Sequence, residues 1–271
     1  MSPGDKLGNV PVNANIGVVF SGPIDPLTVS GTTISVSGGG TTSIPASISF
    51  SNNNQKVEIT PEAPLPPSTA MTLTISGVAD VAGNAVAAQT THFLTGTAPA
   101  TATAGVLVEN PASAATGVPV NAAISLKTNA VIDLTTVTTS TFQVYDQTLG
   151  QTVAGTYTLS ADGMTVYFAP VTQLATGRTY MVNFVNQGMT DLAGNTLTNS
   201  CTGCLTQLLV HRRGRGEHDG SAGDRGEPIE RPAKVPINAQ IVVAFNEPVN
   251  GESLGGVTLS ANGSAVGLSS A

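Results

Sequence analysis

Hydrophobic residues along this chain alternate with polar or small residues at the two-residue spacing of β-strands. The alternation appears in residues 16–20, 57–59, 73–75 and 166–168, and side chains two residues apart lie on one face of a strand. Turn-forming runs such as SGGG, SNNN and SADG separate these segments at short intervals. No stretch combines helix-forming residues with a 3.6-residue period over three turns. The pattern therefore predicts an all-β fold.

The chain also contains an internal repeat. The words VPVNANIGVVF, VPVNAAISLKT and VPINAQIVVAF begin at Val10, Val118 and Val235. The words VEITPEAPL and VYFAPVTQL begin at Val57 and Val166, so the first two copies match in internal spacing as well as in sequence. Units of about 100 residues with short strands and frequent turns are typical of β-sandwiches.

The repeat divides the chain into five segments. We expect a first β-sandwich at 1–97, a linker at 98–105, a second sandwich at 106–206, an anomalous charged segment at 207–234 and the N-terminal part of a third repeat at 235–271. The third copy is less than half as long as the others, so we expect the chain to be a fragment of a larger polypeptide.

Two copies of one turn supply six candidate structural residues. In the words ADVAGN and TDLAGN we expect the aspartate to accept hydrogen bonds from backbone amides two residues on. We expect the Gly-Asn pair to supply the positive φ that closes a hairpin. The residues are Asp80, Gly83 and Asn84 in the first copy and Asp191, Gly194 and Asn195 in the second.

Tyr180 is a seventh candidate. The segment Leu174–Tyr180, LATGRTY, resembles a tyrosine corner, in which the phenol ring packs inside and its hydroxyl bonds the backbone across the connection. The first repeat has Met71 at this place, so the fold does not require the hydroxyl.

Together, the VPVNAxI word, a strand ending in Phe, the later VxxxPxxxL and a DxAGN turn resemble the SbsA-type bacterial Ig-like domain. The resemblance covers 2–97, about 106–206 and the beginning of a copy at 235–271. That family occurs as tandem modules in S-layer and other secreted or surface-anchored bacterial proteins. The resemblance implies tandem Ig-like sandwiches, an extracellular or cell-surface location, and no catalytic residues.

The composition and net charge argue against some classes of binding partner. The net charge of −7 and the pI of about 4.8 argue against nucleic acid or an anionic membrane as a general partner. No apolar run approaches the length of a transmembrane helix, so we expect no membrane insertion, and no signal peptide is visible in the opening residues. The expected partners are other domains of the same polypeptide and cell-wall or surface glycans.

Residues 207–234 break the repeat pattern. They hold six of the ten Lys and Arg residues where the repeat predicts the closing strand of the second sandwich and the opening of the third. Codons for Gln207–His211 permit Ser-Phe-Leu-Phe-Thr in a shifted frame, and those for Gly223–Arg231 permit an opening that contains Asn-Pro. The favoured hypothesis is therefore translation out of frame, which would remove the closing strand and expose an unpaired sheet edge.

Two alternatives exist for this charged segment. One is a flexible charged linker between domains. The other, a basic arm that binds nucleic acid, is disfavoured because five acidic residues cancel most of the positive charge and no aromatic residue is interleaved.

Reactive side chains are few. Cys201 and Cys204 can form a small disulfide bond in an exported protein, with free or artefactual thiols as the alternative. Two thiols alone do not make a structural zinc site. We expect His92 to face outward from a closing strand, and His211 and His218 lie in the anomalous segment. No Ser-His-Asp arrangement can be argued from these three histidines.

Calcium is the one metal ion for which the sequence offers candidate ligands. Asp25, Asp80, Asp133 and Asp191 recur at equivalent turns, and oxygen-rich loops at the end of a sandwich can bind Ca²⁺. Each loop offers one carboxylate, so a capping or turn role is favoured over a metal site. Calcium-rigidified adhesin repeats remain an alternative function.

The expected function is a non-catalytic spacer or adhesive module of a bacterial surface or secreted protein. The alternative is an accessory, carbohydrate-binding module of a secreted polysaccharide-acting enzyme. Sugar-binding faces usually present exposed aromatic rings. The chain has no Trp, and Tyr145, Tyr157 and Tyr167 are the candidates outside the tyrosine corner.

Overall fold

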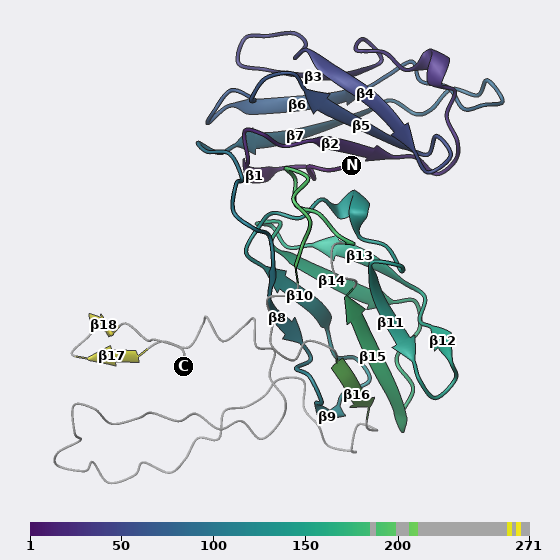
Figure 1. Ribbon diagram of the computed structural model, residues 1–271, viewed down its shortest axis with the longest axis vertical. Coiled ribbons are helices and arrows are strands. Elements are labelled where there is room, and N and C mark those ends of the chain that lie inside the picture. Colours follow the sequence, from purple (N-terminus) through teal and green to yellow (C-terminus); the bar gives the residue numbers. More distant parts are fainter. Residues whose placement is uncertain (185–187, 199–205, 211–258, 262–263, 267–271) are drawn as a thin grey trace.

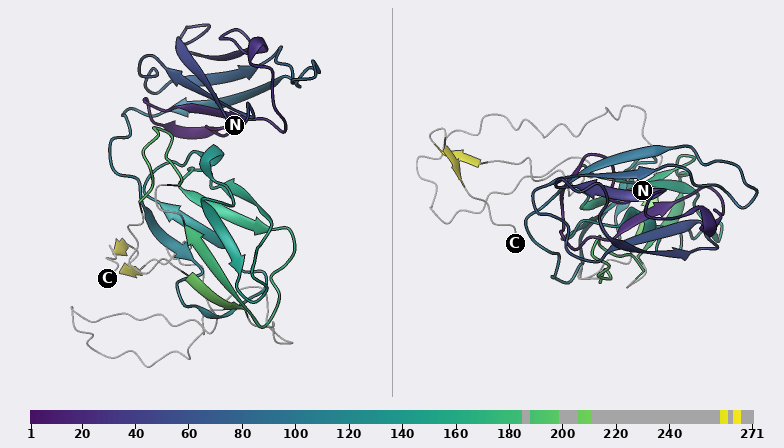
Figure 2. Two further views of the ribbon diagram at one scale, coloured as in Figure 1. Left: turned by 45° about the vertical axis from the view of Figure 1, so that its right-hand side comes forward. Right: turned by 90° about the horizontal axis from the view of Figure 1, so that it is seen from above.

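The computed structural model describes residues 1–184, 188–198, 206–210, 259–261 and 264–266. Most of these residues form two β-sandwiches that follow one another along the long axis of the molecule (Figure 1). The left-hand view of Figure 2 shows the same separation into a first and a second repeat, and the right-hand view looks along this axis, so that the two repeats overlap. Within the described part of the chain, no helix is long and apolar enough to span a membrane.

Repeat 1 consists of two sheets, with strand orders β1-β7-β6-β3 and β2-β5-β4. Strand β1 runs parallel to β7, and the other pairs are antiparallel. The elements are β1 (Leu7–Val10), β2 (Ile16–Val19), the 3₁₀ helix η1 (Pro26–Thr28), β3 (Ile34–Gly38), β4 (Ala46–Ser51), β5 (Lys56–Pro61), β6 (Ala70–Ile75) and β7 (Gln89–Thr95).

Repeat 2 has the sheet orders β12-β11-β15-β16-β9 and β13-β14-β10-β8. Its parallel pair β16–β9 corresponds to the pair β7–β1 of repeat 1. The elements are β8 (Val106–Asn110), β9 (Thr116–Val118), β10 (Ile124–Thr128), the 3₁₀ helix η2 (Leu134–Thr136), β11 (Phe142–Asp146), β12 (Gln151–Thr152), β13 (Gly155–Leu159), β14 (Thr165–Pro170), β15 (Arg178–Phe184) and β16 (Thr206–Val210).

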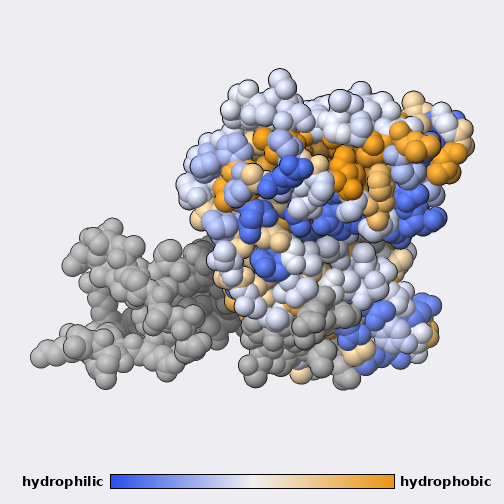
Figure 3. Space-filling view, turned by 45° about the horizontal axis from the view of Figure 1, so that its top comes forward, coloured by the Kyte–Doolittle hydropathy of each residue, from blue (hydrophilic) through white to orange (hydrophobic). Residues whose placement is uncertain are grey.

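The predicted all-β fold is therefore confirmed, and the two-residue alternation explains it. Strand β6 alternates between side chains that point to the core and side chains that do not, and β11 and β15 do the same. Burying this apolar face drives the sheets together. Apolar residues also form a band across the surface of repeat 1 in the space-filling view (Figure 3).

The closing strand of repeat 2 is present, which corrects the expectation that it was lost. Strand β16 pairs antiparallel with β15, from Arg178↔Val210 to Val182↔Thr206. The physical reason is that the ladder hydrogen bonds come from backbone groups, which every residue from Thr206 to Val210 carries. Residues 207–210 thus belong to repeat 2. Residues 211–234 lie outside the described residues, so the frame hypothesis remains a prediction.

The third repeat is described only as a short hairpin. Strands β17 (Leu259–Ala261) and β18 (Ser264–Val266) pair antiparallel. The other residues of the segment 235–271 lie outside the described part, so a third sandwich remains a prediction.

Candidate functional site: the contact between the two repeats

Each repeat carries two aspartate turns at the same end of its sandwich. Isolated bridges join Ile24 to Asp80 in repeat 1 and Ile132 to Asp191 in repeat 2. The residue after each isoleucine caps a 3₁₀ helix, η1 or η2. The two turns of each repeat therefore lie side by side and form one end surface of the sandwich.

The Asp80 carboxylate organises its own turn. The backbone amides of Ala82 and Asn84 each donate to its Oδ1 at 2.8 Å, and the Asn84 side chain donates to its Oδ2 at 2.8 Å. The side-chain and backbone hydrogen bonds from Asn84 lower the pKa of Asp80. The same three bonds form around Asp191 at 2.9 Å.

The structure changes one detail of these turns. Positive φ occurs at Gly83 (83°) and Gly194 (82°), but not at the following Asn84 and Asn195. The expectation that the Gly-Asn pair shares the left-handed conformation is therefore wrong. Glycine alone takes it because it has no Cβ, and the asparagine contributes its side-chain amide to the carboxylate instead.

Asp25 and Asp133 act as caps of the two 3₁₀ helices. Oδ1 of Asp25 accepts from the Leu27 amide at 2.9 Å, and Oδ1 of Asp133 accepts from the Thr135 amide at 2.9 Å. Each of these carboxylates thus satisfies a backbone donor at the start of its helix. Within the described residues, no group of three or more His, Cys, Asp or Glu side chains is placed to hold a metal ion.

Tyr180 is buried with its hydroxyl against the backbone. The side chain of the residue lies in the core of repeat 2, and the Ala175 amide donates to its Oη at 2.8 Å. Tyr180 pairs with Asp146 across the sheet, where Met71 pairs with Gly38 in repeat 1. The phenol of repeat 2 therefore takes the place of a thioether in repeat 1.

The end surface of repeat 2 packs against repeat 1. Val131 and Leu192 belong to repeat 2 by sequence, but they lie in the apolar cluster that forms the core of repeat 1. Leu192 is 1% exposed, whereas Val81, its counterpart in the DVAGN turn of repeat 1, is 66% exposed. The backbone amide of Asn15 donates to the Leu192 carbonyl at 2.7 Å. A hydrophobic contact and a backbone hydrogen bond thus join the repeats.

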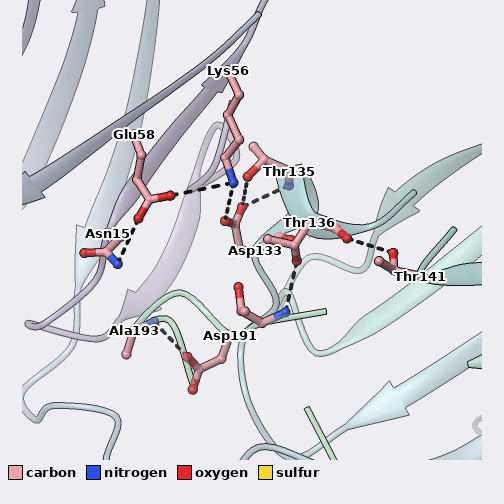
Figure 4. Close-up of polar contacts among 10 residues, drawn as sticks. Asn15, Lys56, Glu58, Asp133, Thr135, Thr136, Thr141, Asp191 and Ala193 are labelled. Atoms are coloured by element: carbon pink, nitrogen blue, oxygen red, sulfur yellow. Dashed lines mark hydrogen bonds and ion pairs between the residues drawn. The ribbon is translucent and has the colours of Figure 1, made fainter. Parts of the chain in front are cut away.

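A polar cluster borders this apolar contact (Figure 4). Nζ of Lys56 lies 3.8 Å from Oδ2 of Asp133 and 3.8 Å from Oε2 of Glu58. The Asn15 side chain donates to Oε1 of Glu58 at 3.4 Å. The side chains of Lys56 and Asp133 are 16% and 13% exposed, so solvent screens this ion pair less than it screens a pair on the open surface.

Two glycines allow the repeats to approach closely. A Cβ added at Gly17 of β2 would lie 2.8 Å from Oγ1 of Thr135. One added at Gly163, where φ is +70°, would lie 2.7 Å from Cγ1 of Val131 and 3.1 Å from Cδ1 of Leu7. A larger residue at Gly17 would collide with repeat 2, and one at Gly163 would displace Val131 within repeat 2 and crowd Leu7 of repeat 1.

Asparagines from both repeats hold the linker 98–105. The Asn13 side chain of repeat 1 accepts from the Ala100 amide at 2.8 Å and donates to its carbonyl at 3.0 Å. The Asn129 side chain of repeat 2 donates to the Thr103 carbonyl at 3.1 Å and accepts from the Gly105 amide at 2.8 Å. The linker is therefore fixed at both of its ends.

The three candidate sugar-binding tyrosines do not form one surface. The Tyr157 ring packs at 5.6 Å from Phe142 and 5.3 Å from Phe168, and burial raises the pKa of Tyr157 to about 12. Tyr145 and Tyr167 alternate with inward-facing residues on β11 and β14, which belong to opposite sheets. These two rings therefore lie on opposite faces of the sandwich.

Of the remaining candidates, His92 is the one that lies in the described part of the chain, and it is not part of this contact. His92 is exposed on β7. Cys201, Cys204, His211 and His218 lie outside the described residues, so the disulfide bond remains a prediction.

Sequence reasoning did not identify the contact itself. The contact depends on Asn15, Gly17 and Lys56 of repeat 1, which follow the strand pattern without a special signal. The one available signal was the difference between the two turns. Leu192 adds a methylene to the position that Val81 occupies, and the larger residue is the buried one.

Comparison with solved structures finds similarity to an S-layer protein and to L,D-transpeptidases. The S-layer protein SbsC is 19% identical over 77% of this chain and 25% of that chain, with a TM-score of 0.30. The N-terminal part of SbsC is 18% identical over 78% and 43% of the chains, with a TM-score of 0.30. An L,D-transpeptidase from Mycobacterium tuberculosis H37Rv is 14% identical over 78% and 87%, with a TM-score of 0.26. This chain thus corresponds to about a quarter of the SbsC structure.

Sequence comparison agrees with the repeat structure. No curated protein is similar enough in sequence to match this chain. A profile of the bacterial Ig-like domain matches residues 1–95 and again residues 100–206. These two matches cover the two sandwiches and most of the chain, and they confirm the predicted resemblance. The chain belongs to the bacterial Ig-like domain family and carries two copies of that domain.

Proposed function

We propose that the two Ig-like domains form a non-catalytic spacer, which holds neighbouring modules of a bacterial surface or secreted protein at a fixed distance and orientation. The observation that carries this proposal is the burial of Val131 and Leu192 of repeat 2 in the core of repeat 1. Modules joined by a flexible tether need no such contact.

The linker and the polar cluster support the same proposal. Rotation of one repeat against the other would break the Lys56–Asp133 ion pair and the Asn15–Leu192 backbone hydrogen bond. It would also pull on a linker that both repeats bind. Several such contacts at one junction favour one relative orientation. A fixed orientation is what a spacer in a surface array or stalk needs.

Residual dipolar couplings of backbone amides in the whole chain would test this proposal. We expect the amides of repeats 1 and 2 to fit one common alignment tensor. In the variant Gly17→Val, the new side chain would collide with Thr135, and the two repeats should then need separate tensors. The matched control is Gly8→Val in β1, where an added Cβ meets nothing within 4 Å. Separate tensors for the unmodified chain would refute the spacer function.

The carbohydrate-binding alternative has less structural support. A sugar ring usually stacks on an exposed aromatic face, and Tyr157 lies among core rings while Tyr145 and Tyr167 lie on opposite sheets. A glycan-array screen of the whole chain would decide the matter. Specific binding that is lost in Tyr145→Ala or Tyr167→Ala would favour the carbohydrate-binding function.

A further inference from the structure

A cavity of about 240 Å³ opens between the two sheets of repeat 1, beside β3 and β4. These strands end their sheets on the side opposite to β1 and β2. In Figure 1 they lie above β1 and β2, farther from repeat 2. The cavity is therefore separate from the contact between the repeats. The lining residues that matter here are Ile34, Ile44, Ile48, Ile59 and Glu62.

Three aromatic rings fill the equivalent place in repeat 2. The ring centroids of Phe142 and Tyr157 are 5.6 Å apart, those of Tyr157 and Phe168 are 5.3 Å apart, and those of Phe142 and Phe168 are 6.3 Å apart. Tyr157 pairs with Phe168 across β13 and β14, as Ile48 pairs with Ile59 across β4 and β5. Two of the three rings are thus replaced by isoleucine in repeat 1.

The third ring is replaced in the same way. Phe142 is the first residue of β11, and its amide donates to the Thr138 carbonyl at 2.8 Å. Ile34 is the first residue of β3, and its amide donates to the Ser30 carbonyl at 2.9 Å. Ile34 therefore corresponds to Phe142. Each isoleucine is smaller than the ring that it replaces, and the cavity lies where the rings would be.

One of these losses of volume is partly compensated. A Cβ added at Gly155 of repeat 2 would lie 2.3 Å from Cζ of Phe168, so the ring covers this glycine. Repeat 1 has Ala46 at the equivalent place, since Ala46 pairs with Pro61 as Gly155 pairs with Pro170. The methyl group of alanine takes some of the space of this ring, and the cavity of about 240 Å³ is what remains open.

A backbone acceptor faces the place of the missing tyrosine. In repeat 2 the Tyr157 hydroxyl donates to the Phe142 carbonyl. In repeat 1 the Ser76 amide donates to the Thr33 carbonyl at 2.8 Å, and hydrogen-bonded pairs alternate with non-bonded pairs along an antiparallel ladder. The next residue, Ile34, thus points its carbonyl away from β6, as Phe142 points its carbonyl away from β15. Isoleucine at position 48 has no hydroxyl to donate to it.

A carboxylate lies at the mouth of the cavity. Glu62 is exposed and lines the opening. Its amide donates to the Pro45 carbonyl at 3.0 Å, as the Val171 amide donates to the Ala154 carbonyl at 2.9 Å, so valine is the counterpart in repeat 2. The negative charge is therefore particular to the repeat that has the cavity, and it favours a positively charged ligand.

We propose that this cavity binds a free small molecule, a phenol that carries a positive charge. Its ring takes the place that Tyr157 has in repeat 2, its hydroxyl donates to the Ile34 carbonyl, and its cation lies beside Glu62. An apolar cavity of about 150 Å³ holds benzene, so about 240 Å³ admits one substituted ring. This site goes beyond the spacer function and does not depend on it.

An NMR titration of the whole chain with tyramine tests the proposal. Tyramine should shift the amides of Ile34, Ile48 and Glu62 saturably, with a Kd of about 1 mM for so small a ligand. Phenethylamine lacks the hydroxyl and should bind about fivefold more weakly, because one hydrogen bond is lost. The uncharged p-cresol should bind about threefold more weakly, because the exposed carboxylate contributes little.

Two variants assign the contacts. Ile48→Tyr supplies the ring of repeat 2 and should weaken tyramine binding at least about tenfold, because a filled cavity leaves no room. The matched control is Ser49→Thr, which takes the neighbouring, outward-facing residue from repeat 2 and should leave the binding unchanged. Glu62→Gln should make tyramine and p-cresol bind equally well.

Several results would overturn the proposal. They are tyramine binding that persists in Ile48→Tyr, shifts spread over both repeats, or phenethylamine binding as tight as that of tyramine. If Ile48→Tyr lowers the Tm, the comparison of the three ligands and Glu62→Gln decide instead. The dipolar couplings between the repeats report on the spacer function separately, since β3 and β4 are not part of the junction.

Discussion

Truncation of Leu192 to alanine should destabilise the repeat to which Leu192 does not belong. Leu192 is carried by the DLAGN turn of repeat 2, yet it lies 1% exposed in the core cluster of repeat 1. Removing its side chain leaves a cavity between the two repeats. Repeat 1 should therefore lose stability, although its own sequence is unchanged.

The size of the effect follows from burial. Truncating a buried leucine costs about 2–5 kcal/mol in a closed core. The junction can relax or admit water, so we expect about 2 kcal/mol, at the lower end of that range. For a folded unit of roughly 200 residues, this corresponds to a fall in Tm of about 4–8 °C.

Hydrogen exchange resolved by residue would locate the loss. Core amides of repeat 1, such as that of Leu73, should exchange faster in Leu192→Ala. The matched control is Val81→Ala, which truncates the equivalent residue of repeat 1. Val81 is 66% exposed, so the control should change the free energy of unfolding by less than about 0.5 kcal/mol. Equal effects of the two variants, or a loss confined to repeat 2, would refute the packing of Leu192 on repeat 1.

Three further predictions concern repeat 2. Tyr180→Phe removes the hydroxyl that accepts from Ala175 and should cost about 1 kcal/mol in urea unfolding; unchanged stability would contradict the corner. Burial raises the pKa of Asp146, but hydrogen bonds from Arg178 and backbone amides outweigh it and lower the pKa overall. Stability from this pair is therefore complete above the ordinary pKa of about 3.9 and is lost as pH falls through the lowered value. Asp146→Asn should flatten the fall in Tm at acidic pH, and an unaltered profile would count against the pair. Gly163→Ala, at a φ of +70° beside the junction, should destabilise the chain by more than about 1 kcal/mol in urea unfolding, and a neutral result would argue against the close approach.

The sequence predicted the features that depend on local structure. The alternation of apolar with polar or small residues predicted the strands, because a strand buries one face whichever strand it pairs with. The DxAGN word predicted the Asp80 turn, because its hydrogen bonds connect residues only two to four positions apart. The Leu174–Tyr180 segment resembled a tyrosine corner for the same reason. In each case the interacting atoms are neighbours in the chain.

The features that sequence missed depend on distant residues. Lys56 and Asp133 lie in different repeats, and no periodicity relates them. Strand β16 was expected at this place from the repeat but was judged lost, because residues 207–210 share a segment with charged residues. Backbone pairing needs only an extended chain. The contact between the repeats could be recognised only after folding brought the end of one sandwich against the side of the other.

The sequence also indicates that one repeated fold does not make identical junctions. By the offset that relates Val57 to Val166, repeat 2 has Thr165 in place of Lys56. Asn250 lies as far after Val235 in the third copy as Asp133 lies after Val118 in repeat 2. Asparagine therefore replaces aspartate at this position. Both members of the ion pair are thus replaced together in the next pair of copies. Asparagine can cap a helix as aspartate does, but it carries no charge for a lysine to meet. Aspartate caps the 3₁₀ helix at this position in repeats 1 and 2, whereas the third copy carries a residue type that has no charge. The repeat sequence therefore does not preserve the Lys56–Asp133 ion pair, which belongs to the contact between repeats 1 and 2.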